Sequence, residues 1–393
     1  MQSLTLALIL LLSSAGATAK DRWITIDSDA VGTANKHLNA KSFSVDESRN
    51  GITLLKVNES NLEEISHMMH EEHHRCGGYV LHESLAEART ELYGDSAKIF
   101  GSKSLFADYA IDQGDVIRPL VDSVEESKIR GTILKLSSFK NRYYKSKYGV
   151  QSQTWLRDHW KELTSHRSDA KVEFFKHTRW AQPSVVLTLK GESEEVVVVG
   201  GHADSIAGWF GRENATAPGA DDNASGIATI TEIIRVLMKS NFVPKKTIKF
   251  MGYAAEEVGL LGSKEIAKDF KRRGVDVIGA MQLDMTNYNG SDLDIVMMTD
   301  YTNAAQNAFI GKLIDEYVAG VSWGYDKCGY ACSDHASWNG EGYPASMPFE
   351  SRKGNMNRKI HTSGDTLKVS SDNADHATKF AKMGVAFVVE LDR

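Results

Sequence analysis

Residues 194–205, EEVVVVGGHADS, lead from four consecutive valines through two glycines to a histidine and an aspartate. A run of β-branched residues without alternation is typical of a strand that is covered on both faces. Similar patterns predict strands at residues 184–191, 245–255, 277–286 and 292–299, and helices at residues 225–240, 260–274, 303–318 and 378–391. Because strands and helices alternate from Trp155 onward, we predict an α/β fold with a doubly wound, mostly parallel sheet flanked by helices.

Charged and polar residues follow several of these strands. The candidates are His202, Asp204, Asp221, Asp222, Glu256, Glu257 and Asp284, with His361 supplied by a later loop. Ligands of such sheets bind beyond the carboxyl ends of the strands, so these side chains are expected to meet at one edge. A single buried histidine is more often a core residue, and a lone aspartate there more often caps a helix. Their convergence favours a functional site instead.

Buried imidazoles and carboxylates at one edge would be costly without compensation, and metal ions are the usual way to neutralise them. Two histidines and three carboxylates suit a pair of divalent metal ions, and this combination of ligand types favours zinc. One carboxylate would bridge, since paired metals lie roughly 3.5–4 Å apart.

The adjacent Glu256 and Glu257 follow the strand predicted at residues 245–255. Neighbouring residues that leave a strand point to different sides, so the two carboxylates can have different roles. We expect Glu257 to bind metal. Glu256 would take the proton of the attacking water and needs a pKa high enough to pass it on.

Seven segments carry a family resemblance: GGHADS, PGADDNASG, YAAEEVGLLGS, QLDMTNY, CGYACSDHASW, YPASMPFES and IHTSGDT. Together they resemble the bacterial secreted leucyl aminopeptidases of the M28 metallopeptidase family, from about Phe106 to the C-terminus. The resemblance implies a zinc-exopeptidase-like fold and two Zn²⁺ ions per subunit. Their implied ligands are His202 and Asp284 for one ion, Glu257 and His361 for the other, and Asp222 as the bridge.

The resemblance also implies catalytic roles. Glu256 matches the general base, Tyr330 the tyrosine that stabilises the developing oxyanion, and Asp204 the carboxylate that orients His202. The expected reaction is hydrolysis of the N-terminal peptide bond of a peptide by metal-bound hydroxide.

The family pocket implies an apolar substrate site. Its residues would be Met285, Met298, Cys328, Cys332, Met347, Phe349 and Ile360, together with Tyr330. Such a lining favours Leu, Met and Phe at the peptide N-terminus, with loose discrimination because methionine is adaptable. The family has aromatic residues where this chain has Lys353 and Met356, which argues against a strict leucine preference. Lys353 could point inward and repel Lys and Arg substrates, or extend to solvent.

The N-terminal residues predict export. Leu4 to Leu12 are apolar and Ala17-Thr18-Ala19 fits a cleavage site, as in a signal peptide, although no Lys or Arg precedes the apolar run. We expect residues 1–19 to be a signal peptide, 20–104 a pro-segment and 105–393 the peptidase domain. The protein would be secreted and monomeric, with its own pro-segment as inhibitor and chaperone.

The three cysteines are consistent with export. Cys328 and Cys332 are expected to form a disulfide, which the family resemblance also implies, while two separate thiols are the alternative. Cys76 is left over, in the histidine-rich stretch HEEHHRCGG of the pro-segment. A thiolate or imidazole from this stretch could occupy a metal position, although steric blocking alone would suffice for inhibition.

Other functions fit the sequence less well. The net charge of −6 gives no reason to expect a nucleic-acid partner, and no membrane partner is expected after signal cleavage. His70-Glu71-Glu72-His73-His74 fits the H-E-x-x-H zinc signature, but glycines follow it and it lies in the pro-segment. No G-x-S-x-G serine-hydrolase motif is present. A glutaminyl-cyclase-like enzyme and a non-hydrolytic metal-binding protein of the same fold remain the alternatives.

Overall fold

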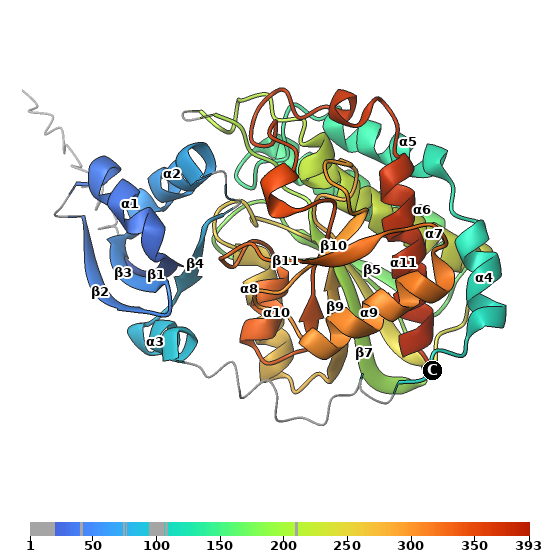
Figure 1. Cartoon of the computed structure of the whole chain (residues 1–393). Coiled ribbons are helices and arrows are strands. Elements are labelled where there is room, and N and C mark those ends of the chain that lie inside the picture. Colours follow the sequence, from blue (N-terminus) through green and yellow to red (C-terminus); the bar gives the residue numbers. More distant parts are fainter. Residues whose placement is uncertain are drawn as a thin grey trace, which may run out of the picture.

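The computed structural model describes residues 20–39, 42–73, 75, 77–93, 106, 109–208 and 211–393. Figure 1 shows a smaller N-terminal unit, residues 20–93, beside a larger unit that contains the rest of the described chain. The predicted signal peptide and the predicted boundary between residues 104 and 105 lie outside the described residues. Among the helices of the described residues, none is both long and apolar enough to cross a membrane.

The larger unit is built on a six-stranded sheet in the order β12-β9-β7-β8-β6-β5. The strands are β5 (Ala170–Phe175), β6 (Ser184–Leu189), β7 (Ser193–His202), β8 (Lys246–Tyr253), β9 (Val277–Gln282) and β12 (Ala345–Ser346). Pairs from β12 to β8 are parallel, and β6 pairs antiparallel with both β8 and β5. This confirms the predicted α/β fold, with an antiparallel extension at one edge.

The start predicted for the strand–helix alternation is wrong. Trp155 lies inside α6 (Lys147–Leu163), and β5, β6 and β7 then follow one another without a helix. Short connections can join antiparallel neighbours such as β5 and β6, whereas parallel β7 and β8 need the crossover helix α7 (Gly226–Lys239).

Helices cover both faces of the sheet (Figure 1). One face packs against α8 (Leu261–Arg272) and α10 (His335–Gly340), through side chains such as Ile266, Phe270 and Trp338. The other face packs mainly against α7 and α11 (Asp375–Leu391), with α4 (Gly114–Asp122), α5 (Glu126–Ser137), α6 and α9 (Ala304–Tyr317) in the same apolar cluster. The valines of β7 divide between these two clusters, as expected for a strand covered on both faces.

A small second sheet lies beside the first, in the order β11-β10-β13. Its strands are β10 (Ile295–Met298), β11 (Trp323–Asp326) and β13 (Pro348–Phe349). The strand predicted at residues 292–299 therefore exists, but it pairs outside the central sheet. Its side chains Val296 and Met298 help to form an apolar cluster near the carboxyl ends of the large sheet.

The N-terminal unit has its own fold and core. Its antiparallel sheet has the order β2-β3-β1-β4, with β1 (Asp21–Asp27), β2 (Phe43–Arg49), β3 (Ile52–Asn58) and β4 (Tyr79–His82). The helices are α1 (Val31–His37), α2 (Leu62–His73) and α3 (Leu85–Tyr93). Ile24, Leu55, Ile65 and Met69 are at most 1% exposed in a common apolar cluster. The polar, mixed pattern of this segment had not indicated an ordered sheet.

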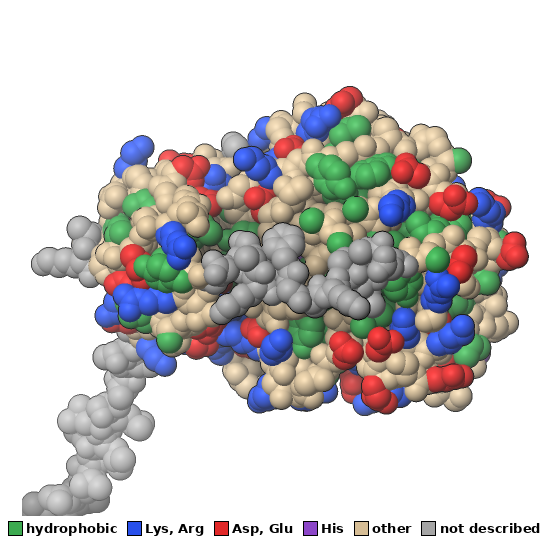
Figure 2. Space-filling model, turned by 60° about the horizontal axis from the view of Figure 1, so that its bottom comes forward, with side chains coloured by type: hydrophobic (Ala, Val, Ile, Leu, Met, Phe, Trp, Pro, Cys, Tyr) green, Lys and Arg blue, Asp and Glu red, His purple; other side chains and the backbone are tan. Residues whose placement is uncertain are grey.

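The N-terminal unit rests on the segment that follows β8. Ser66 Oγ of α2 donates to the Glu257 carbonyl oxygen at 2.8 Å, and Tyr79 Oη donates to the Val258 carbonyl oxygen at 2.8 Å. Lys268 of α8 pairs with Glu87 at 2.8 Å. On the face shown in Figure 2, acidic and basic side chains are interspersed over both units. The contacts at Glu257 and Val258 place the small unit directly over the predicted site.

Arg142 holds the loop that leads to Asp222. Its buried guanidinium donates to the carbonyl oxygens of Ala203 at 2.9 Å and Gly219 at 2.9 Å, and also to that of Pro218. It therefore ties the end of β7 to the segment before α7. Carbonyl groups buried without a partner are costly, so this side chain should matter for stability.

We expect Arg142→Met to lower the free energy of unfolding by about 2–4 kcal/mol, because several buried carbonyl groups lose their donor. Arg130→Met is the matched control, since Arg130 is partly exposed and its ion pair, with Glu126 of the same helix α5, lies at the surface. Its effect should stay within about 0.5 kcal/mol. Denaturant unfolding followed by circular dichroism measures both. Equal stabilities of the two variants would contradict this role of Arg142.

Candidate metal centre

The predicted ligands meet where the parallel strands end. His202 is the last residue of β7, Asp222 lies in the turn η4 (Ala220–Ser225) before α7, Glu257 follows β8, Asp284 follows β9, and His361 lies between β13 and α11. Each of the five is at most 7% exposed. The placement follows from the topology, because parallel strands bring their carboxyl ends to a common edge.

Asp222 stands between two groups of ligand atoms. Its Oδ1 is 3.0 Å from His202 Nε2, and its Oδ2 is 3.0 Å from His361 Nε2. Asp284 Oδ1 lies 3.3 Å from His202 Nε2, and Glu257 Oε2 lies 3.2 Å from His361 Nε2. Atoms bonded to one zinc ion at about 2.0–2.2 Å in a tetrahedron lie roughly 3.3–3.6 Å apart. The observed separations of 3.0–3.3 Å are slightly shorter than this, and small shifts of the side chains would accommodate two metal positions that share Asp222.

These atoms need a cation to be satisfied. Within the described part of the chain, several of the ligand atoms are buried and make no hydrogen bond of normal geometry: both ring nitrogens of His202, Asp284 Oδ1 and both carboxylate oxygens of Glu257. Burial raises the pKa of Glu257 to about 7, and the charge of Asp222 acts in the same direction. Polar atoms left in this way cost free energy, and a donor set of imidazoles and carboxylates suits zinc. The residues fit a pair of zinc ions.

Glu256 is fully buried beside the two groups but belongs to neither. Its Oε2 lies 4.0 Å from His202 Nε2, and neither of its carboxylate oxygens makes a hydrogen bond to a described residue. Burial holds the pKa of Glu256 well above its usual range, and nearby carboxylates, first that of Asp334, act in the same direction. Such a carboxylate is suited to accept a proton.

Asp204 positions the segment that carries both glutamates. Its two oxygens accept the backbone N–H of Glu256 at 3.1 Å and that of Glu257 at 3.2 Å. Asp204 Oδ1 also lies 3.5 Å from His202 Nδ1, which is long for a hydrogen bond. The contact of Asp204 with His202, which the resemblance implied, is therefore longer than its two hydrogen bonds with the backbone. No pattern in the sequence predicts the two hydrogen bonds from the backbone N–H groups to Asp204.

Further residues form hydrogen bonds that position the candidate metal ligands but do not belong to the metal groups themselves. Asp365 accepts the backbone N–H of Asp221 at 3.2 Å and of Asp222 at 3.0 Å, and Ser333 Oγ donates to Asp284 Oδ2 at 2.6 Å. The candidate Asp221 belongs to neither metal group, since its carboxylate accepts from the Asn287 backbone N–H and from Asn357 Nδ2. A rule based on strand ends could not identify Asp365 or Ser333, because both lie in loops.

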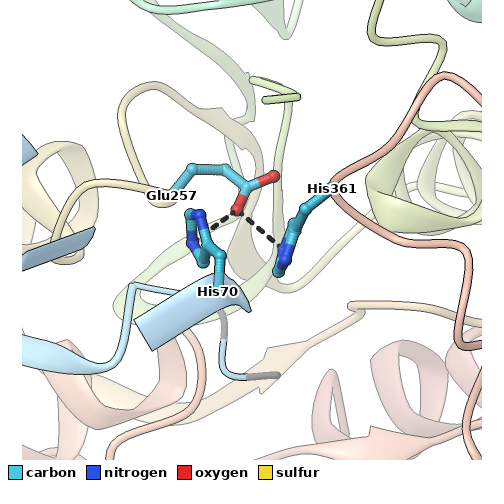
Figure 3. A group of neighbouring side chains, drawn as sticks. All are labelled: His70, Glu257 and His361. Atoms are coloured by element: carbon cyan, nitrogen blue, oxygen red, sulfur yellow. Dashed lines mark ion pairs between the residues drawn. The ribbon is translucent and has the colours of Figure 1, made fainter. Parts of the chain in front are cut away.

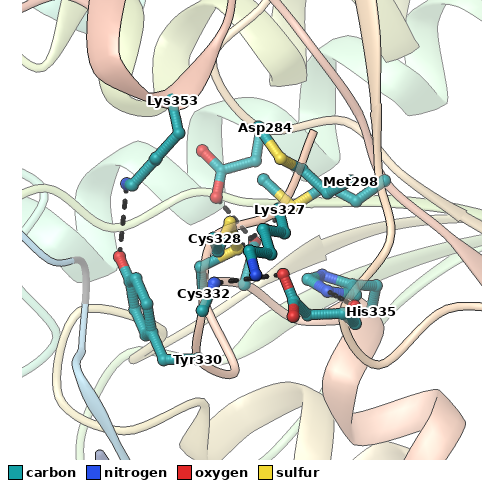
Figure 4. Close-up of a disulfide and its surroundings, with 12 residues drawn as sticks. Asp284, Met298, Lys327, Cys328, Tyr330, Cys332, His335 and Lys353 are labelled. Atoms are coloured by element: carbon teal, nitrogen blue, oxygen red, sulfur yellow. Dashed lines mark hydrogen bonds between the residues drawn. A yellow bond between two sulfur atoms is a disulfide. The ribbon is translucent and has the colours of Figure 1, made fainter. Parts of the chain in front are cut away.

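The predicted pocket residues gather in one apolar cluster beside the metal groups. The cluster contains Met285, Met298, Cys332, Met347, Phe349 and Ile360, with Cys328 packed against it, and adds Val296 and Met356. Cys328 and Cys332 form a disulfide (Figure 4). Cys76, by contrast, lies outside the described residues.

Lys353 points toward the predicted oxyanion residue. Figure 4 shows its amine directed at the hydroxyl of Tyr330, to which it donates at 3.4 Å. The Lys353 amine also lies 3.2 Å from Met356 Sδ and 6.0 Å from the centre of the Phe349 ring. Of the two orientations considered from the sequence, the inward one is observed.

His70 of α2 reaches the site from the N-terminal unit (Figure 3). Its Nε2 is 3.5 Å from Glu257 Oε2, and its ring centre is 4.0 Å from that of His361. Candidate ligand atoms of His70, Glu257 and His361 lie within 4.8 Å of one another. Of the two histidines of the H-E-x-x-H pattern, His70 is thus at this group, and His74 lies outside the described residues. His73, which lies between them in the sequence, contacts Thr33 Oγ1 through its Nε2 at 2.9 Å.

Comparison with known proteins agrees with this geometry. The model of peptidase family M28 matches residues 184–385. Leucine aminopeptidase 1 of Coccidioides posadasii (strain C735) is 39% identical over 289 residues, which are 70% of this chain and 73% of that protein.

Two solved structures from Legionella pneumophila extend the similarity to most of the chain. LapA aminopeptidase is 29% identical with a TM-score of 0.81, over 95% of this chain and 98% of LapA. LapB is 30% identical with a TM-score of 0.78, over 95% of this chain and 99% of LapB. The relatives thus include fungal and bacterial proteins. With half of its length matched by the family model and its ligand groups at the edge of this sheet, the chain belongs to peptidase family M28.

Proposed function

We propose that this protein is a secreted dizinc aminopeptidase that removes the N-terminal residue from peptides, with a broad preference for Leu, Met and Phe. Its M28 membership and its leucine aminopeptidase relatives make it a metallo-aminopeptidase. The proposal adds to this the number of metal ions, the preferred N-terminal residues and the roles of individual side chains. It also adds secretion and the grouping with the bacterial secreted enzymes.

The placement of Asp222 carries the proposal of two metals. Each of its carboxylate oxygens lies 3.0 Å from a different histidine, and each histidine has one further carboxylate within 3.3 Å. We assign His202 and Asp284 to one ion, Glu257 and His361 to the other, and Asp222 to both. Bound there, the ions would polarise the scissile carbonyl group and make a water molecule more acidic.

Glu256 supplies the proton transfer. Its carboxylate accepts the proton of the attacking water and delivers it to the departing amine of the shortened peptide. Asp204 supports this role, because it holds the amides of Glu256 and Glu257 and thereby fixes the base relative to a ligand. A non-hydrolytic metal-binding protein has no need of this base, and the aminopeptidase relatives disfavour a cyclase.

Tyr330 and the apolar cluster would receive the substrate. The Tyr330 hydroxyl can donate to the oxyanion that develops at the scissile carbonyl. The Lys353 amine beside it adds a positive charge, which also stabilises an oxyanion. Burying a Leu-sized side chain against the methionine-rich cluster is worth roughly 1.5–3 kcal/mol, which supports a broad apolar preference.

We further propose that residues 20–104 are a removable inhibitory segment. Two contacts support this, the Ser66 and Tyr79 hydrogen bonds to the carbonyl groups of Glu257 and Val258. In addition, the Arg75 guanidinium lies 5.1 Å from the centre of the Tyr330 ring. A peptide could not reach the centre while α2 occupies this position.

We expect Glu256→Gln to retain both metals but to lose activity by about a hundred- to ten-thousandfold, because an amide cannot accept the proton of water. Glu257→Gln should instead lower the affinity for one metal. Metal analysis and hydrolysis of Leu-p-nitroanilide, both after removal of residues 20–104, measure the two effects. Glu194→Gln is the control, since that side chain of β7 is 92% exposed. The reverse pattern, with metal lost only from Glu256→Gln, would refute the assignment.

The unmodified enzyme should hydrolyse Leu- and Phe-p-nitroanilides well and Lys-p-nitroanilide poorly, because the Lys353 amine repels a second ammonium group. Lys353→Met should raise the kcat/KM for the Lys substrate relative to Leu by about tenfold, or ~1.4 kcal/mol. Lys359→Met, in the same loop but exposed, should leave the ratio unchanged. A wild-type preference for Lys over Leu would rule out this substrate site without affecting the metal centre.

A further inference from the structure

We propose that His70 of the N-terminal unit is a protein ligand of the metal position formed by Glu257 and His361, so that this unit blocks the centre by coordination as well as by bulk. The inference rests on the proposed dizinc function. It assigns to α2 a metal-binding residue that lies outside the peptidase domain.

The geometry is that of a ligand. His70 Nε2 faces Glu257 Oε2 at 3.5 Å, and Glu257 Oε2 lies 3.2 Å from His361 Nε2 (Figure 3). The first separation lies within the roughly 3.3–3.6 Å between two ligands of one tetrahedral zinc, and the second is only slightly shorter. The His70 side chain is only 2% exposed and the Glu257 side chain 1%, so both atoms lie in the buried space where the ion would lie.

A structural role in the core does not explain His70. Its Nε2 is buried and makes no hydrogen bond with the described residues, and 3.5 Å is too long for one to Glu257. The buried His82 of the same unit differs in this respect, because its Nε2 lies 3.0 Å from Thr25 Oγ1. An unpartnered imidazole nitrogen aimed at a carboxylate–histidine pair is costly unless a cation sits between them.

The docking of α2 fixes His70 at the Glu257 segment. Ser66, one helical turn before His70 and therefore on the same side of α2, donates to the Glu257 carbonyl oxygen at 2.8 Å. Helix α2 thus contacts Glu257 twice: Ser66 binds its backbone carbonyl group, and His70 lies next to its carboxylate. The two contacts reinforce each other, because moving the helix would break both.

The consequence is a closed coordination set. His70, Glu257, His361 and the shared Asp222 offer four protein ligands, as in structural zinc sites, whereas catalytic sites keep one position open. Departure of the N-terminal unit would reopen that position. Conversely, metal at this position should hold α2 in place, because a ligand that binds only the docked form stabilises it.

The test compares His70→Ala with the wild type in the full-length protein, with His67→Ala as the matched control. His67 is also buried in α2 but is absent from both metal groups. Zinc affinity is measured by chelator competition, and the visible absorption spectrum is recorded after loading with Co²⁺. We expect His70→Ala to weaken one of two zinc sites by at least about tenfold and to change the Co²⁺ spectrum. His67→Ala should do neither.

X-ray absorption of the zinc-loaded wild type tests the same proposal without a substituted protein, so the result does not depend on whether a variant folds. It should find three imidazoles for two zinc ions, contributed by His70, His202 and His361. Two imidazoles for two ions, or equal affinities and spectra in His70→Ala and wild type, would overturn the assignment of His70 while leaving the dizinc centre intact. Binding of fewer than two metals by the wild type would instead overturn the proposed function itself.

Discussion

The burial of many acidic groups at one edge of a sheet is the constraint on which the rest of this structure depends. Asp204, Asp222, Glu256, Glu257, Asp284 and Asp365 are all at most 2% exposed within a small region. Removing each charge from water costs several kcal/mol unless donors or cations replace the lost hydration. Burial raises the pKa of Asp365 to about 8, which shows how unfavourable its charge is there. Hydrogen bonds from backbone N–H groups to the carboxylates of Asp204 and Asp365 compensate part of this cost. Bound cations would compensate the rest.

The position of the site follows largely from local pattern. The valine run of β7 and the apolar runs of β8 and β9 identify buried strands, and the residues after them necessarily meet at one edge. For this reason His202, Glu257 and Asp284 could be predicted at strand ends. Asp222 and His361 were candidates from loops, and the family resemblance assigned them to particular metal positions. Strand direction is not contained in such patterns, so the antiparallel pairing of β5 and β6 was not predicted. The same holds for the separate pairing of β10, because short strands reveal their partners only in the folded chain.

His70 could not be predicted as a neighbour of Glu257 for a related reason. The contact joins His70 to Glu257, residues far apart in the sequence and in two units with separate cores. Nothing in the histidine-rich stretch indicates which imidazole faces inward, and the H-E-x-x-H pattern suggested a different geometry. The site therefore combines strand ends, which local sequence can locate, with a docked helix, which it cannot. The apolar cluster around Met298 and Phe349 is intermediate, since resemblance supplied its members but not the inward direction of Lys353.

The covalent connection between the two units has a thermodynamic consequence of its own. Because both units belong to one chain, α2 meets the Glu257 segment as part of the same molecule, at an effective concentration that does not fall when the protein is diluted. The contacts need only modest intrinsic affinity to keep the units together under that condition. One break in this connection would make the docking bimolecular and sensitive to dilution. At high dilution the same hydrogen bonds that hold the N-terminal unit would then no longer be sufficient, and its departure would follow from mass action alone.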